Sequence, residues 1–297
     1  MDVVVTGSSG LIGSRLVQTL REQGHQVVRL VRSGGGPDTA RWDLDAGTIE
    51  AAALDGAGAV VHLAGESIAS SRWTDAQKAR IMGSRVKGTT LLAETLAGLS
   101  SPPSVFLSGS AVGYYGETGD TAVDESGPAG DDFPSLVAQR WEACAQPAID
   151  AGVATAFLRT GVVLDADGGA LKAQLLPFKL GLGGRAGSGR QYLSWITLDD
   201  HVRATITLLT AGLTGPVNLT APNPCTNAEF AKALGAALGR PTFIIPMFGP
   251  RVLYGRELAD SLLLTSQRVV PGALNGIGFA FDHPDIDGAL RSVLDAA

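Results

Sequence analysis

The 297-residue chain has little of the features that mark several specialised protein classes. Its two cysteines, Cys144 and Cys225, are too few and too far apart for a disulfide framework or a cysteine metal site. It lacks the interleaved basic and aromatic residues of nucleic-acid-binding proteins, and no apolar stretch approaches the ~18 residues of a membrane helix. An acidic residue follows Met1, unlike in a signal peptide. We therefore predict a soluble, cytoplasmic protein that binds no nucleic acid, membrane or metal.

The chain does have enough apolar sequence for a large core. Hydrophobic residues make up 45% of it, and the formal net charge of −6 is only mildly acidic. This length and composition fit one big domain or two coupled domains. The first half alternates short apolar runs with helical patterns, which predicts a parallel sheet covered by helices on both faces.

The most informative segment is a glycine pattern directly after the first predicted strand. That strand, Asp2–Thr6, runs into Gly7-Ser8-Ser9-Gly10-Leu11-Ile12-Gly13, and the helix predicted over residues 11–23 has its apolar residues on one face. In a dinucleotide-binding unit such glycines make the turn, clear the pyrophosphate and let the helix pack on the strand. The alternative is a glycine-rich turn that binds no ligand. The residues predicted to hold the pyrophosphate are Gly7, Ser9, Gly10, Leu11, Ile12 and Gly13.

The end of the second predicted strand favours NADP(H) over NAD(H). NAD-binding units place an Asp or Glu about twenty residues past the glycines for the ribose 2′-hydroxyl, whereas an Arg there accommodates a 2′-phosphate. Here the strand is followed by Arg32 and Ser33, and the next carboxylate is Asp38. We predict that Arg32 binds the phosphate and that Ser33 assists. The alternative for Arg32 is a solvated surface arginine.

The first part of the chain is predicted to form the nucleotide-binding domain. Long helices are expected over about residues 74–99, capped by Thr74, and 134–151. We predict an α/β fold in which residues 1–164 form a Rossmann-type doubly wound parallel sheet. Its further strands are expected where short apolar runs recur, at residues 40–43, 59–63, 105–108 and 155–158.

The second part of the chain is less regular. Beyond Leu164 the alternation fades into loops rich in Gly and Pro, among them a candidate mobile loop over residues 181–189. A strand is predicted over residues 217–219, and a helix capped by Thr226 or Asn227 follows it. We predict that residues 165–297 mainly form a smaller C-terminal substrate-binding lobe.

Residues at the carboxyl ends of the predicted strands are the candidates for function, because ligands of open parallel sheets bind there. Asp43 and Leu44 can meet an adenine edge with a side chain and a backbone group, and the small residues after the fourth strand let a ribose lie against the backbone. The cofactor contacts predicted beyond the glycine turn are Arg32, Ser33, Asp43, Leu44, Leu63, Ala64, Gly65, Glu66, Arg85 and Ser108.

Hydroxyl and phenol groups concentrate after the fifth strand. Ser110, Tyr114 and Tyr115 can hydrogen-bond a substrate carbonyl or relay a proton beside a nicotinamide, so we predict them to be catalytic. For Arg159, a clamp on a carboxylate or phosphate and a structural ion pair are equally good interpretations. The residues predicted to contact the substrate are Arg159, Gln191 and Trp195.

Two histidines are predicted to be structural. His62 lies inside the apolar run of the fourth strand, where a hydrogen-bonded core histidine is the simpler interpretation. Asp199, Asp200 and His201 lack a fuller set of metal ligands. They are predicted to cap a helix over residues 202–209.

The chain resembles the extended short-chain dehydrogenase/reductase superfamily, in its NAD(P)-dependent epimerase/dehydratase group, and more specifically the atypical 39U subgroup. The match runs nearly from end to end. It implies a Rossmann-type NADP(H)-binding protein of oxidoreductase or epimerase type, and it suggests a homodimer through the two long helices. It implies no established reaction. The segments that carry the resemblance are residues 6–13, 61–65, 71–73, 84–86, 108–116, 159–164, 177–184, 194–196, 218–224 and 266–269.

The chain departs from the superfamily at the catalytic pair. The superfamily uses a Tyr and, four residues later, a Lys whose ammonium lowers the pKa of the phenol. If Glu142 matches the acid that usually follows this pair, Pro134 and Ala138 take the places of Tyr and Lys. A phenol with no ammonium beside it keeps a pKa of about 10 and is a poor base at neutral pH. The residues four positions beyond the four tyrosines are Thr118, Gly119, Ile196 and Leu258.

Two functions are consistent with these observations. The first is an NADP(H)-dependent oxidoreductase or epimerase-like protein that acts on a small polar, sugar-like substrate. The second is a non-catalytic NADP(H)-binding module that senses redox state or binds a protein partner, as the missing Tyr/Lys pair suggests. A large apolar surface patch in place of a polar cleft at the strand ends favours the second function.

Overall fold

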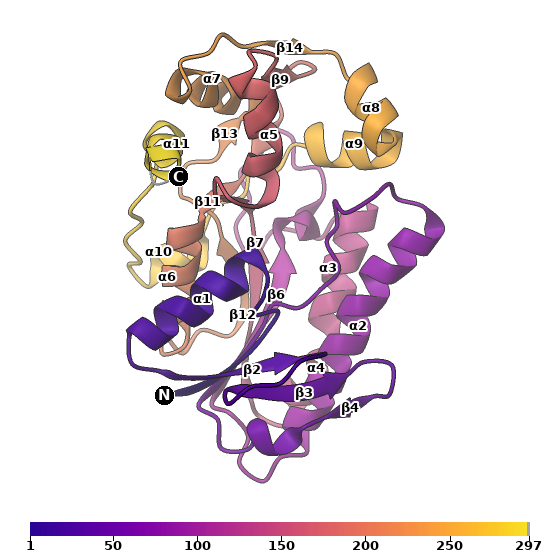
Figure 1. Ribbon diagram of the computed structural model, residues 1–297, viewed down its shortest axis with the longest axis vertical. Coiled ribbons are helices and arrows are strands. Elements are labelled where there is room, and N and C mark those ends of the chain that lie inside the picture. Colours follow the sequence, from indigo (N-terminus) through magenta and orange to yellow (C-terminus); the bar gives the residue numbers. More distant parts are fainter. Residues whose placement is uncertain (296–297) are drawn as a thin grey trace.

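In the computed structural model, which describes residues 1–295, a large sheet with flanking helices forms one part of the molecule and a smaller part sits at its end (Figure 1). The eight strands lie in the order β12-β7-β6-β5-β1-β2-β3-β4. All neighbours are parallel except β3 and β4. The strands are β1 (Asp2–Thr6), β2 (Gln26–Val31), β3 (Thr39–Asp43), β4 (Thr48–Ile49), β5 (Ala59–His62), β6 (Val105–Ala111), β7 (Ala154–Thr160) and β12 (Gly215–Leu219).

The strand order reverses beside β1, which confirms the predicted doubly wound sheet. From β1 the chain builds outward through β2 and β3 on one side, then returns to β5 on the other and continues through β6, β7 and β12. The point between β1 and β5 is therefore the topological switch point, where α/β sheets bind their ligands. The glycine turn after β1 lies at this point.

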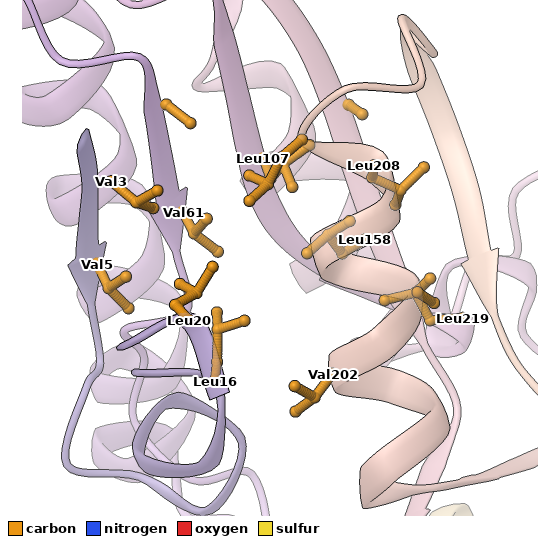
Figure 2. Packing of buried hydrophobic residues seen from close by; sticks show 14 of the residues in the cluster. Val3, Val5, Leu16, Leu20, Val61, Leu107, Leu158, Val202, Leu208 and Leu219 are labelled. Atoms are coloured by element: carbon orange, nitrogen blue, oxygen red, sulfur yellow. The ribbon is translucent and has the colours of Figure 1, made fainter. Parts of the chain in front are cut away.

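Helices cover both faces of the sheet because its strands are apolar on both sides. On one face α1 (Leu11–Glu22) and α6 (Leu198–Leu208) bury Leu16 and Val202 against strand residues such as Val5 (Figure 2). On the other face α2 (Asp75–Ala97) and α4 (Gln146–Asp150) pack against strand residues such as Val4. Successive strand residues point to opposite faces, so neighbours in the sequence enter different layers.

The helix predicted over residues 134–151 is broken into two. α3 (Phe133–Ala143) ends before α4 begins at Gln146. Pro147 explains the break, since it has no N–H to donate to the carbonyl of Ala143 and its ring would clash there. The other predicted long helix is α2, and its predicted cap is confirmed, because the Thr74 side chain accepts a hydrogen bond from the Gln77 N–H.

The smaller part has its own core, in which Leu171, Phe178, Trp195, Phe230 and Leu290 are buried together. The smaller part also contains three two-stranded sheets, in which β8 pairs with β11, β9 with β14, and β10 with β13. Its strands are β8 (Val162–Leu164), β9 (Gly184–Ala186), β10 (Tyr192–Leu193), β11 (Trp195–Thr197), β13 (Cys225–Thr226) and β14 (Phe243–Ile245). Its helices are α5 (Gly169–Lys179), α7 (Asn227–Ala237), α8 (Phe248–Tyr254), α9 (Arg256–Leu263) and α11 (Ile286–Asp295).

The chain beyond Leu164 does not stay in this smaller part. α6 and β12 return to the large sheet, and α10 (Gly272–Gly276) packs against β12. The predicted loop over residues 181–189 also contains a strand, β9, which pairs with the distant β14. Two short 3-10 helices complete the elements, at Ala51–Ala53 and Val112–Tyr115.

None of the helices within residues 1–295 combines the length and apolar character needed to cross a membrane. The same residues hold no group of three or more His, Cys, Asp or Glu side chains placed to bind a metal ion.

Candidate functional site

The glycine turn at the switch point has the geometry of a phosphate cradle. Gly7 adopts a φ of +67°, and a Cβ on it would lie 2.7 Å from the carbonyl carbon of Leu63. A Cβ on Gly13 would lie 2.2 Å from the Gly7 carbonyl oxygen, so this glycine is required for the helix to start so close to the strand. Gly10 is the exposed N-cap of α1 and has no side-chain cap. The first N–H groups of α1 therefore remain available to an anion.

Arg32 and Ser33 follow β2 at the same edge of the sheet and are exposed. Among residues 1–295, Arg32 has no ion-pair partner. The nearby carboxylate of Asp38 is already paired with Arg21, at 3.0 Å between Nη2 and Oδ2. The Arg32 guanidinium is thus free for a phosphate.

The loop after β5 is held over the end of β1 by one hydroxyl group. The Thr6 Oγ1 accepts hydrogen bonds from the backbone N–H groups of Leu63, at 3.1 Å, and Ala64, at 3.3 Å. It also lies 2.7 Å from Nδ1 of His62, whose Nε2 lies 3.0 Å from the Thr89 Oγ1. Burial, with a smaller contribution from Arg85, lowers the pKa of His62 to about 3. His62 is therefore a neutral core residue, as predicted.

We expect the protein to lose stability as the pH falls below about 6.5, because its buried histidines resist protonation. Burial lowers the pKa of His201 to about 4, and that of His62 to about 3, whereas an unfolded chain takes up these protons near pH 6.5. As the pH falls from 6.5 to 5, the loss in the free energy of unfolding from each histidine should steepen from about 0.7 towards about 1.4 kcal/mol per pH unit. Urea unfolding at pH 7.5, 6.5 and 5.5 measures this slope, and His62→Gln should remove about half of it. An unchanged slope in that variant would contradict the assignment.

Arg85 places a positive charge beside the loop of residues 63–66. Its Nη1 donates to the carbonyl oxygens of Glu66, at 2.8 Å, and Ile81, at 3.2 Å. Its guanidinium lies 4.7 Å from the ring centroid of Trp141. Burial lowers the pKa of Arg85 to about 10, so the side chain remains charged at neutral pH.

A cleft of about 180 Å³, here called the α3 cleft, opens between Arg85 and α3. Pro134 and Ala138, the residues that the resemblance places at the Tyr and Lys positions, both form its wall. Trp141 also lines it, and among the described residues the buried indole Nε1 has no hydrogen-bond partner. The cleft therefore has no phenol–ammonium pair at these positions, and a buried, unsatisfied N–H donor lies in its wall.

A buried polar network lies beneath this cleft. Ser110 Oγ donates to Oε1 of Glu142 at 2.6 Å. Arg159 forms a two-pronged ion pair with the same carboxylate, from Nε at 2.8 Å and from Nη2 at 2.9 Å. Its Nη1 donates to the Tyr115 OH at 2.9 Å, and that OH donates to Asn218 Oδ1 at 2.7 Å. Five side chains from four separate segments of residues 110–218 thus form one chain of hydrogen bonds.

This network changes the interpretation of three predicted site residues. Arg159 is 3% exposed and forms a structural ion pair, which was one of the two interpretations that the sequence allowed. The Tyr115 OH both donates and accepts within the network, and burial raises its pKa further above the range of a useful base. The ring of Tyr114 stacks on Arg159, with 3.4 Å from guanidinium carbon to ring centroid. Both tyrosines support Arg159 in this geometry.

Among the other predicted contacts, Trp195 and Ser108 are fully buried, whereas Asp43 is exposed and forms part of a turn. The Trp195 side chain is fully buried in the smaller core, so its predicted contact with substrate is not present in this structure. Ser108 is also fully buried. The Asp43 carboxylate accepts hydrogen bonds from the N–H groups of Asp45 and Ala46, and these bonds lower the pKa of Asp43. The Asp43 side chain thus stabilises the turn after β3. Thr197, not Asp199 or Asp200, is the N-cap of α6.

Sequence reasoning missed the partners of these residues. In the sequence Glu142 stands out only as the acid after the expected pair, and Asn218 only as part of a segment that carries the family resemblance. Gln267, which lines the α3 cleft, also lies in such a segment. No local pattern shows that these three positions meet the end of β6, because their pairing depends on the packing of α3, β12 and the segment after α9.

Comparisons with known proteins agree with this geometry. Residues 3–134 match the NAD dependent epimerase/dehydratase family, and residues 245–293 match a domain of unknown function, DUF1731. Epimerase family protein Mb2239 of Mycobacterium bovis is 43% identical over 291 residues, which cover 97% of this chain and 96% of that protein.

Two solved structures are similar over nearly the whole chain. The crystal structure of human epimerase family protein SDR39U1 (isoform 2) with NADPH has 36% identity and a TM-score of 0.92, with 100% of both chains covered. A nucleoside-diphosphate sugar epimerase from Corynebacterium glutamicum has 37% identity and a TM-score of 0.82, over 99% of this chain and 58% of that one. The chain belongs to the NAD-dependent epimerase/dehydratase family, among the epimerase family proteins that include human SDR39U1.

Proposed function

We propose that this protein binds NADP(H) across the switch point and acts as an oxidoreductase or epimerase-like enzyme on a small substrate in the α3 cleft. The observation that carries the proposal is the glycine cradle at the uncapped start of α1, with the unpaired Arg32 at the same sheet edge. The human relative crystallised with NADPH supports it. Gly7, Ser9, Gly10, Leu11, Ile12 and Gly13 surround the pyrophosphate in this proposal, and Arg32 and Ser33 bind the 2′-phosphate.

Calorimetric titration of the purified protein with NADPH and NADH tests the cofactor. Arg32→Ala should weaken NADPH binding about tenfold to a hundredfold, because it removes charge-assisted hydrogen bonds of about 1.5–3 kcal/mol. NADH binding should not change. Arg240→Ala, at an exposed arginine beyond the end of α7, is the matched control. Equal affinity of the unmodified protein for the two cofactors would contradict the role of Arg32.

In this proposal Ser110, which is 5% exposed and whose neighbour Ala111 lines the α3 cleft, contacts the reacting oxygen of the substrate. A bound nicotinamide supplies or accepts the hydride. The Ser110 proton points to Glu142 at 2.6 Å, so the free lone pairs of Oγ are acceptors suited to a substrate hydroxyl. Arg159, supported by Tyr114 and Tyr115, orients Glu142. On oxidation of an alcohol, the hydroxyl proton passes to Ser110 as the serine proton passes to Glu142.

Turnover assays separate this enzyme from a non-catalytic module. Ser110→Ala and Glu142→Gln should both abolish NADPH-linked turnover while leaving NADPH binding intact. Full turnover in the Ser110→Ala/Tyr115→Phe double variant would rule out the catalytic assignment.

A non-catalytic NADP(H)-binding module remains the second candidate, because Pro134 and Ala138 replace the superfamily pair. Exposed apolar side chains on the smaller part, such as Leu176, Phe243 and Phe248, also favour a protein partner. Under that function no metabolite oxidises bound NADPH. A homodimer through α2 and α3 and a cytoplasmic location stay predictions of the sequence.

A further inference from the structure

A second, larger cleft lies in the smaller part of the molecule. This C-terminal cleft has a volume of about 350 Å³ and is lined by residues of α5, α8 and α9 and of the start of α7. Figure 1 shows α5 on one side of the smaller part and α8 and α9 on the other. That volume is in the range of small-molecule sites. Leu262 and Thr265 line both this cleft and the α3 cleft, so the two clefts are adjacent and share part of their wall. A ligand in the C-terminal cleft therefore lies next to the proposed reaction site.

The wall of the C-terminal cleft is uncharged. Among the described residues that line it, none is Asp, Glu, Lys, Arg or His, and most are apolar, including Val162, Phe178, Phe230 and Leu258. Without a basic partner, the transfer of a phosphate or carboxylate from water to such a site is strongly unfavourable. The composition of the wall therefore selects against a nucleoside diphosphate.

The start of α7 could attract an anion, but a side chain of the protein already occupies it. The Glu229 carboxylate accepts hydrogen bonds from the Thr226 N–H, at 2.7 Å, and from the Thr226 hydroxyl, at 2.8 Å, in a capping box. A second anion next to this carboxylate would be repelled. Asn227, the first residue of α7, lines the cleft directly beside it.

Two of the neutral polar side chains in the wall, Gln191 and Asn227, are anchored to the backbone of Ala186. The Gln191 Nε2 donates to the carbonyl oxygens of Ala186, at 3.1 Å, and Leu263, at 2.7 Å. Its Oε1 has no hydrogen-bond partner among residues 1–295. The Asn227 Oδ1 accepts from the Ala186 N–H at 2.7 Å, and its Nδ2 likewise has no partner there. One neutral acceptor and one neutral donor match a hydroxyl, carbonyl or amide group.

We propose that the C-terminal cleft binds an uncharged, largely apolar substrate whose carbonyl or hydroxyl end enters the α3 cleft, and that it does not bind a nucleotide sugar. The proposal rests on the proposed function, since it names the substrate class of the same site. The apolar substrate proposed here also differs from the small polar, sugar-like substrate expected from the sequence. The activity named for the Corynebacterium glutamicum protein is therefore not carried over to this chain.

Calorimetric titration of the NADPH-loaded protein with straight-chain 2-alkanones of four to ten carbons, and with UDP and UDP-glucose, tests the substrate class. Each added methylene should tighten alkanone binding about fourfold until the cleft is filled, from about 0.8 kcal/mol per buried CH₂. UDP and UDP-glucose should bind more weakly than the longest alkanone. Tighter binding of either nucleotide than of every alkanone, or no alkanone binding in a protein that binds NADPH, would overturn the proposal.

Two variants locate the binding in the cleft. Ala173→Phe fills the cleft from the exposed face of α5 and should weaken alkanone binding at least tenfold, whereas Ala236→Phe on the exposed face of α7 should not. Asn227→Asp keeps the oxygen that accepts from Ala186 and replaces the free donor with a carboxylate, so it should also weaken binding. Alkanone binding that none of these variants changes would overturn the proposal. So would a dimer that Ala173→Phe dissociates, because a second copy would then fill the cleft.

Failure of the proposed function is distinguishable from failure of this inference. If NADPH itself does not bind, the proposed function is wrong. The same alkanone series on the cofactor-free protein then decides whether the cleft takes apolar ligands.

Discussion

Arg159→Met should lower the free energy of unfolding by about 3–5 kcal/mol, because it leaves a buried carboxylate without its partner. The Glu142 side chain is 11% exposed and the Arg159 side chain 4% exposed, so little water can replace the lost guanidinium. The Tyr115 OH also loses the donor that holds it at 2.9 Å. Equilibrium unfolding in urea, followed by circular dichroism, measures the change.

The matched control for this prediction is an exposed ion pair. Arg15 and Asp199 lie 3.0 Å apart with side chains 43% and 59% exposed, so Arg15→Met should change stability by only about 0–1 kcal/mol. The double variant Arg159→Met/Glu142→Met should recover much of the loss, because it leaves no unpaired charge. A loss below about 1 kcal/mol in Arg159→Met would show that the buried pair is not a stabilising unit.

Gly13→Ala should weaken NADPH binding at least tenfold and lower the free energy of unfolding by about 1–3 kcal/mol, the usual cost of overpacking. The added Cβ would lie 2.2 Å from the Gly7 carbonyl oxygen and 2.8 Å from its carbon. Both are backbone atoms, so no flexible side chain can move aside. The start of α1 must shift away from β1, and its free N–H groups shift with it.

Gly83→Ala, in the middle of α2, is the control for this substitution. A Cβ at Gly83 has no atom within 4 Å, so this variant should gain roughly 0.5–1 kcal/mol from its better helix propensity. NADPH titration and urea unfolding of both variants check the contrast. Unchanged stability and affinity in Gly13→Ala would mean that the turn is not tightly packed.

Local patterns predicted the elements around the cofactor site well. The strand Asp2–Thr6, the three glycines and the arginine after the second strand all lie within the first 32 residues. Steric rules for glycine and strand periodicity act over such short spans. The core position of His62 followed from the apolar run around it. The one large error in the long helices came from Pro147, whose effect on residues 134–151 a periodic pattern does not display.

The polar network beneath the α3 cleft could not be predicted in this way. Tyr115 and Asn218 are 103 residues apart, and Arg159 is 44 residues from Tyr115 and 17 from Glu142. Whether Arg159 binds a ligand or an internal carboxylate depends on how α3 packs against β6 and β7. Burial of Trp195 likewise depends on contacts with α5 and α7 in the smaller core.

The sequence by itself determined the class of the sheet, the glycine turn after β1 and the absence of a Tyr/Lys pair, because each is a property of neighbouring residues or of residue identity. Only the tertiary structure decided that Arg159 and Glu142 neutralise each other, that Pro134 and Ala138 line a cleft, and that an uncharged cleft lies next to it. Those properties depend on which distant side chains share a low-dielectric interior. There an unpaired charge destabilises the fold, whereas a charge with hydrogen-bonded partners is held in one position.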